Sequence, residues 1–185
     1  QDQMSVSFCD VFLFAGVLLT AVATPLSAFP IYDLHSHTRA SDGLLTPEQL
    51  VLRAVEHRVG VLAITDHDTT EGIKPAREAI ARNALPLQLI NGVEISTLWE
   101  NHEIHIVGLG IDIDHPAMIA FLAEQSARRM ARAELMAARL EKAHIPGALA
   151  GALALAEGGA VTRGHFARFL INAGKADTMQ QVFKN

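Results

Sequence analysis

The sequence predicts an α/β fold, either an open parallel sheet or a (β/α) barrel, with a helical subdomain after it. Between residues 31 and 114, short apolar runs alternate with amphipathic helical patterns, as they do in consecutive βαβ units. Residues 115–185 show helical patterns alone, so we expect a subdomain inserted into, or appended to, the α/β part. Polar residues follow the apolar runs closely, as in sheets whose strand ends carry a functional site.

The first two predicted strands, residues 31–37 and 61–68, enclose a well-marked helix. Thr46 is the expected N-cap of this helix, and Gln49 completes a capping box. Gly60 is the expected C-cap. The second strand is an uninterrupted apolar run, which is typical of a strand buried on both faces of a parallel sheet.

The later elements are assigned in the same way. A helix at 73–83 precedes strands at 87–96 and 103–112, which the βαβ pattern predicts to be parallel to the first two. The helical subdomain begins with a long helix at 117–143 and continues with helical segments at 147–159, at 161–175 and after Asp177.

Residues 1–30 form an apolar extension with a different character. Its uncharged run is long enough for a signal peptide or membrane anchor through residues 11–28. The preceding flank has no Lys or Arg, however, and Pro25 interrupts the run. We therefore favour a misassigned start or a poorly packed extension, and a cytoplasmic protein that does not bind membranes.

Composition narrows the function classes. A net charge of −5 argues against a broad surface for duplex nucleic acid, so the expected partner is a small nucleotide or a short RNA. The single cysteine, Cys9, excludes an internal disulfide and a zinc site built from several thiolates. Nothing in the composition indicates the oligomeric state.

Histidine and acidic residues lie at the ends of the first three predicted strands and within the fourth. The expected metal ligands are His35, His37, Asp42, His67, Glu94 and His105. Nitrogen and oxygen ligands without sulfur suit Mn²⁺, Zn²⁺ or Fe²⁺. Two such cations about 3.5 to 4 Å apart, bridged by Glu94, would generate a metal-bound hydroxide for phosphate-ester hydrolysis. We expect His67 and Asp68 to take the catalytic roles, with two alternatives for Asp68: it holds a ligand histidine by its second ring nitrogen, or it caps a loop.

Arginines in the helical part suggest a substrate clamp. Arg163, His165 and Arg168 lie at helical spacing in "TRGHFAR", and arginine suits bidentate phosphate binding. An ordinary solvated helix face is an equally good interpretation of this motif. The arginines of the long helix, Arg128, Arg129 and Arg132, are expected to form such a solvated face.

Four motifs in order carry a family resemblance: "DLHSHTRASDG", "LAITDHDTTEG", "GVEIST" and "HEIHIVGL". They resemble the PHP (polymerase and histidinol phosphatase) superfamily of metal-dependent phosphoesterases. The added "GAVTRGHFARFL" is similar to one bacterial branch, the RNase AM exoribonucleases, also described as nucleoside 3′,5′-bisphosphate phosphatases. The resemblance runs from Ile31 to the last residue.

The resemblance implies a distorted seven-stranded (β/α) barrel of the PHP type with an inserted helical domain. It also implies two or three divalent metal ions, often manganese, on the six expected ligands. The implied reaction removes the 3′-phosphate from nucleoside 3′,5′-bisphosphates or trims short 5′-phosphorylated RNA one nucleotide at a time.

The sequence departs from the family after His105, because the later "AHP"-like and "DxH" ligand motifs do not occur. We therefore expect a C-terminally truncated copy with the early barrel strands only, an α/β part at 31–114 and a truncated helical part at 115–185. Its fourth strand would be an exposed edge. Two alternatives stay open: a catalytically impaired fragment with partial metal binding, and a hydrolase for a non-phosphate ester or amide.

Overall fold

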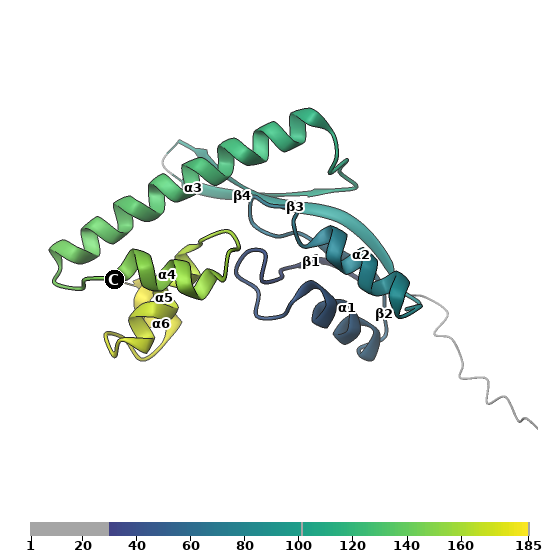
Figure 1. Ribbon diagram of the computed structural model, residues 1–185, viewed down its shortest axis with the longest axis horizontal. Coiled ribbons are helices and arrows are strands. Elements are labelled where there is room, and N and C mark those ends of the chain that lie inside the picture. Colours follow the sequence, from purple (N-terminus) through teal and green to yellow (C-terminus); the bar gives the residue numbers. More distant parts are fainter. Residues whose placement is uncertain (1–29, 101, 185) are drawn as a thin grey trace, which may run out of the picture.

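The computed structural model describes residues 30–100 and 102–184 (Figure 1). Its elements are, in order, β1 (Ile31–Ser36), α1 (Pro47–Glu56), β2 (Val59–Ile64), α2 (Ile73–Arg82), β3 (Gln88–Trp99), β4 (His102–Leu109), α3 (Pro116–Lys142), α4 (Ala148–Ala156), α5 (Arg163–Asn172) and α6 (Met179–Lys184). The expected apolar extension, with its alternative role in export or anchoring, lies outside the described residues apart from Pro30. Among the described helices, none combines the length and the apolar character needed to cross a bilayer.

The strands form one curled sheet in the order β1-β2-β3-β4, which confirms the expected partial barrel. β1 is parallel to β2, and β2 is parallel to β3, with Leu62 opposite Leu89. In Figure 1, α1 and α2 pack beside these strands, α3 runs along the β3–β4 hairpin, and α4 to α6 gather below one end of α3. The chain is therefore a mixed α/β structure whose later part is helical.

The expected parallel orientation of the fourth strand is wrong. β4 is antiparallel to β3, with Glu94 opposite Val107 and Ser96 opposite His105. β3 ends at Trp99 and β4 begins at His102, and so short a link cannot make the crossover that parallel neighbours need. The two strands therefore form a hairpin.

Local sequence signals explain how the first helix begins and ends. Thr46 accepts a hydrogen bond from the backbone N–H of Gln49, whose side chain accepts one from Thr46, which confirms the capping box. The expected C-cap at Gly60 is wrong, because the helix ends earlier and Arg58, with φ 60°, turns the chain. Gly60 lies instead in β2, where a Cβ atom would come within 2.6 Å of the Cβ of Pro30.

Two hydrophobic clusters hold the described part of the chain together. The first packs Val51 of α1 and Ile73 of α2 against Leu62 and other buried residues of β2. The second joins the helices after β4 and contains Ala133 and Phe166. The buried β2 thus provides a fixed platform for the polar residues that follow it.

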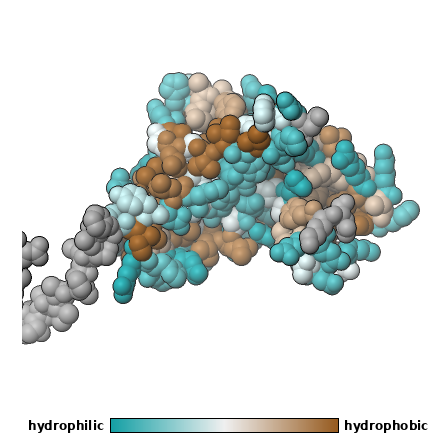
Figure 2. Space-filling model, turned by 180° about the vertical axis from the view of Figure 1, so that it is seen from behind, coloured by the Kyte–Doolittle hydropathy of each residue, from teal (hydrophilic) through white to brown (hydrophobic). Residues whose placement is uncertain are grey.

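Large hydrophobic side chains are exposed on the β3–β4 hairpin. Leu98, Trp99, Ile106 and Leu109 are each more than two-fifths exposed. Seen from behind, the molecule shows a band of hydrophobic residues on its surface (Figure 2). Within residues 30–100 and 102–184, β3 is the only strand that pairs with β4, so β4 is the expected open edge.

Candidate metal centre

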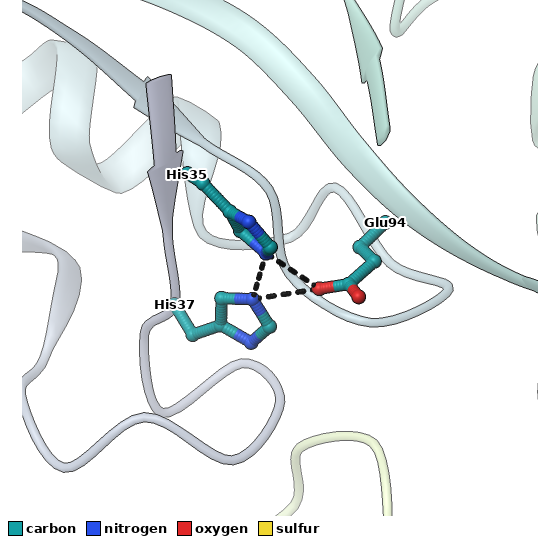
Figure 3. Close-up of side chains that lie close together, drawn as sticks. All are labelled: His35, His37 and Glu94. Atoms are coloured by element: carbon teal, nitrogen blue, oxygen red, sulfur yellow. Dashed lines mark hydrogen bonds and ion pairs between the residues drawn. The ribbon is translucent and has the colours of Figure 1, made fainter. Parts of the chain in front are cut away.

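The first two expected ligands come from the end of β1. Alternate side chains of a strand share one face, and the Nε2 atoms of His35 and His37 lie 3.1 Å apart. Ser36, between them, donates through its hydroxyl to the carbonyl of Ala63 at 2.6 Å. Both imidazoles face Glu94, whose Oε2 lies 2.8 Å and 2.9 Å from their Nε2 atoms (Figure 3). β1 and β3 thus contribute to one group.

A tight loop after β1 brings Asp42 back to His37, with Oδ1 of the aspartate 3.0 Å from Nδ1 of the histidine. The N–H of Gly43 donates to the carbonyl of Thr38 at 2.9 Å. A Cβ atom on Gly43 would lie 2.3 Å from the carbonyl oxygen of His37, so the loop needs glycine there. Thr38 donates through its N–H and its hydroxyl, both at 2.7 Å, to the buried carboxylate of Asp66.

Glu94 is the residue that joins the strands. Its Oε1 lies 2.8 Å from Nδ1 of His105, and its Oε2 faces the two β1 histidines. Nδ1 of His67 lies 3.8 Å from the same Oε2. His67 follows β2 and pairs with Glu94 through an isolated parallel bridge. A single buried carboxylate therefore faces four imidazoles.

The structure brings together all six residues that we expected to bind metal. They form three overlapping groups in which the candidate ligand atoms all lie within 4.8 Å of one another: His35, His37 and Glu94; His37, Asp42 and His67; His67, Glu94 and His105. His105 reaches the cluster from within an antiparallel strand, and not from the carboxyl end of a parallel one. His105 therefore lies in the expected cluster, but the expectation that its strand is parallel to the others is wrong.

The donor atoms of the cluster fit a divalent cation. Nδ1 of His67 is buried and has no hydrogen-bond partner. Leaving a buried polar atom unpaired costs free energy, whereas a neutral imidazole nitrogen is a common metal ligand. Oδ2 of Asp42 lies 3.6 Å from Nε2 of His67, and Oε2 of Glu94 lies 3.8 Å from Nδ1 of the same ring. A cation beside His67 would satisfy the unpaired nitrogen.

The surroundings of these groups shift their pKa values. Burial lowers the pKa of His67, which keeps its ring neutral at neutral pH. Burial alone would raise the pKa of Glu94, but the hydrogen bond with His35 and the nearby imidazoles lower it. Burial also opposes the charged form of His37, yet Asp42 and Glu94 outweigh it and raise the pKa of His37. A neutral His67 beside an ionised Glu94 is the protonation state that binds metal.

Acid should lower the free energy of unfolding of the metal-free protein, because Asp42 becomes protonated. Burial would raise the pKa of this carboxyl, but the hydrogen bond with His37 and the charge of His67 lower it from 3.8 to about 2. A depressed pKa means that the unfolded chain takes up the proton first, so this stabilisation is present above about pH 4 and is lost as the pH falls through about 2. The loss should be about 1 kcal/mol by about pH 3.

Urea titrations in EDTA at about pH 5 and pH 3 measure this contribution. Between the two pH values, the wild type should lose about 1 kcal/mol more free energy of unfolding than Asp42→Asn. Equal losses in the two proteins would show that the Asp42 carboxylate gains nothing from its histidines.

An open pocket of about 390 Å³ lies beside the cluster. Its lining includes three of the expected ligands, together with Arg132 of α3 and Arg163 of α5. Both arginines bind the carboxylate of Glu103, at 2.6 Å and 3.1 Å. Sequence reasoning missed Arg132 and Glu103, since their pairing depends on how α3 crosses the hairpin.

The residues expected to bind substrate have different surroundings. Arg163 lines the pocket and is more than half exposed. His165 is buried, and its Nδ1 accepts the N–H of Thr162 at 3.0 Å, which caps α5. Arg168 donates to the backbone carbonyl of Asp42 at 2.6 Å. Of the three, Arg163 is the one that presents its guanidinium to the pocket.

The expected solvated face of α3 is wrong for Arg129, which is only 7% exposed. Its guanidinium binds the carboxylate of Asp68, so Asp68 does not join the six clustered residues. The spacing of residues in the sequence indicates that Arg129 is buried. The buried positions of α3 recur at helical spacing as Leu122, Gln125, Arg129 and Ala133.

Comparisons with known proteins identify the family of this fold. A family model described as PHP domain matches residues 33–185. This chain belongs to the PHP domain family. The PHP chain is 75% identical over 154 residues to the "5'-3' exoribonuclease Rnm" of Salmonella typhimurium, a match that covers 83% of the chain and 53% of the relative.

Two matches in Chromobacterium violaceum extend the comparison. One is a "3',5'-nucleoside bisphosphate phosphatase", 44% identical over 153 residues, or 82% of the PHP chain and 53% of the relative. The other is the structure of an amidohydrolase with bound sulfate and no metal. It superposes with a TM-score of 0.77 at 42% identity and covers 83% of this chain and 54% of that one. The PHP chain thus spans about half the length of the curated relatives it matches.

Proposed function

We propose that the cluster and its pocket form the site of a metal-dependent phosphoesterase that acts on nucleotides. The observation that carries the proposal is the set of three overlapping ligand groups, linked through His67 and Glu94. Divalent cations bound there would lower the pKa of a coordinated water toward neutrality and offset the charge of the phosphoryl group. We propose two or three Mn²⁺ ions, with Zn²⁺ and Fe²⁺ as chemically suitable alternatives.

The side chains of the site have two further roles, holding the metal ions and binding the substrate phosphate. The neutral ring of His67 and the shared carboxylate of Glu94 hold the reacting centre together. Arg163 and Arg132 also line the pocket, where their guanidinium groups can bind phosphate oxygens. Glu103 holds both arginines in place before the substrate arrives. His165 and Arg168, expected to touch substrate, would support it indirectly by capping α5 and by holding the Asp42 loop.

The names of the relatives support a particular substrate class. One relative is named a 5'-3' exoribonuclease and another a 3',5'-nucleoside bisphosphate phosphatase, and both names denote hydrolysis of phosphate esters of nucleotides. We therefore propose nucleoside 3′,5′-bisphosphates or short 5′-phosphorylated RNA as substrates of this site, in the cytoplasm. The net charge of −5 agrees with a short substrate better than with duplex nucleic acid.

A second candidate follows from the length comparison. Because the chain spans about half of its relatives, it could bind metal without completing catalysis. Phosphate release from adenosine 3′,5′-bisphosphate and AMP release from a 5′-phosphorylated diadenylate, both measured with Mn²⁺, distinguish the two. Release above the background of Glu94→Gln is expected. Bound Mn²⁺ without release would favour the impaired fragment, and the absence of both would remove the proposal.

A further inference from the structure

Asp68 has a carboxylate that is almost fully enclosed. Its side chain is 3% exposed and accepts hydrogen bonds on both oxygens. Oδ1 accepts the backbone N–H of Ser96 at 2.9 Å and the side-chain amide of Gln125 at 3.4 Å. Oδ2 accepts Nε of Arg129 at 2.9 Å and also its Nη2. All its near partners are donors from β3 and α3, so this carboxylate is engaged away from the reacting centre.

The backbone of Asp68 is held between two metal ligands. It directly follows His67, and its N–H donates to the carbonyl of Glu94 at 2.9 Å. The N–H of Glu94 in turn donates to the carbonyl of Asp66 at 3.1 Å. Asp68 has φ 52°, in the left-handed region that residues with a Cβ seldom adopt. The side-chain contacts of Asp68 offset the cost of this conformation and thereby fix the backbone on which His67 is carried.

Arg129 extends the same network to the helical part. It is buried in the middle of α3, and its Nη2 also donates to the hydroxyl of Ser96 at 2.7 Å. Its Nη1 donates to the carbonyl of Val161, just before α5, at 3.5 Å. One guanidinium thus joins the segment after β2, strand β3 and the approach to α5. Arg132, one turn further along α3, lines the pocket.

We propose that Asp68 and Arg129 are positioning residues, which set the placement of His67 and Glu94 and align α3 with the metal centre. This role replaces the catalytic one expected for Asp68, and it rests on the proposed metal site. Both charges are buried, so removing one leaves the other without a partner. A change in the ligand geometry lowers metal affinity even though every ligand is retained, as changes around metal sites generally do.

Mn²⁺ affinity of the 185-residue chain, measured by calorimetry under conditions where circular dichroism shows every variant folded, tests the proposal. Asp68→Asn should weaken binding by at least about 10-fold. The double variant Asp68→Asn/Arg129→Gln keeps the net charge and leaves no buried unpaired charge. It should recover free energy of unfolding relative to the single variant but not recover affinity. Arg128→Met, which removes an exposed arginine from the same helix, should stay within about twofold of the wild type.

The outcomes separate this role from a purely structural one. Affinity that returns with stability in the double variant, or Asp68→Asn within about twofold of the wild type, overturns the proposal. If Asp68→Asn does not fold, Arg129→Lys replaces it, since it keeps the charge but loses the two-pronged contact. If the wild type binds no Mn²⁺, the proposed function fails. Hydrogen exchange at the amides of Asp68 and Glu94 then tests the positioning role by itself. Faster exchange in the variants supports positioning, and unchanged exchange excludes it.

Discussion

Replacing Glu94 by Gln should lower the affinity for Mn²⁺ by at least about 100-fold and abolish any phosphate release. Both carboxylate oxygens are engaged, Oε1 with His105 and Oε2 with His35 and His37. An amide has nearly the same shape, but it is neutral and can offer only one oxygen as a ligand. Calorimetry measures the affinity, and a colorimetric phosphate assay measures release from adenosine 3′,5′-bisphosphate.

Glu103→Gln is the matched control for this substitution. Glu103 lines the same pocket and binds Arg132 and Arg163, but it belongs to none of the three ligand groups. Its replacement should leave Mn²⁺ affinity within about threefold of the wild type, because its carboxylate binds two arginines and its Oε1, 3.7 Å from Nε2 of His105, is too far away to hydrogen-bond that ring. Equal losses in the two variants would mean that negative charge near the pocket, rather than coordination by Glu94, holds the metal.

Replacing Asp66 by Ala should have the largest effect on stability, a loss of about 3 kcal/mol or more in the free energy of unfolding. Asp66 is fully buried and accepts three hydrogen bonds. Two come from Thr38, both at 2.7 Å, and one comes from the hydroxyl of Ser41 at 2.6 Å. Each donor left unpaired costs about 1 to 3 kcal/mol. Urea unfolding of the metal-free protein near neutral pH measures the loss.

Asp114→Ala provides the comparison, because this aspartate is exposed and makes one surface ion pair, with Lys74 at 2.8 Å. It should lose no more than about 1 kcal/mol. Asp66→Ala should also weaken Mn²⁺ binding, since the loop that it organises carries His37 and Asp42. A loss below about 1 kcal/mol for Asp66→Ala would show that the loop forms without its carboxylate.

Much of the metal centre could be predicted from local patterns. His35 and His37 share a face because side chains alternate along a strand, and this rule needs no knowledge of the rest of the fold. His67 follows a strand whose apolar run identifies it as buried. These signals are short-range, and the structure brings the residues that they picked out into one cluster.

The orientation of β4 and the surroundings of α3 depend on longer-range geometry. No helix fits between residues 96 and 103, and this short link is a signal for a hairpin that the βαβ pattern does not include. Arg129 was expected in solvent because isolated guanidinium groups are seldom buried. Its partner, Asp68, lies 61 residues earlier in the chain, and no local pattern pairs the two. Because of the same separation, the sequence alone does not show that Arg129 binds the Asp68 carboxylate.

Anomalous scattering from crystals of the chain grown with Mn²⁺ tests most directly whether these side chains share cations. We expect at least one peak about 2.0 to 2.3 Å from a carboxylate oxygen of Glu94 and a ring nitrogen of His67. Peaks found only elsewhere, more than about 4 Å from all six clustered side chains at saturating Mn²⁺, would contradict the metal centre and the function built on it.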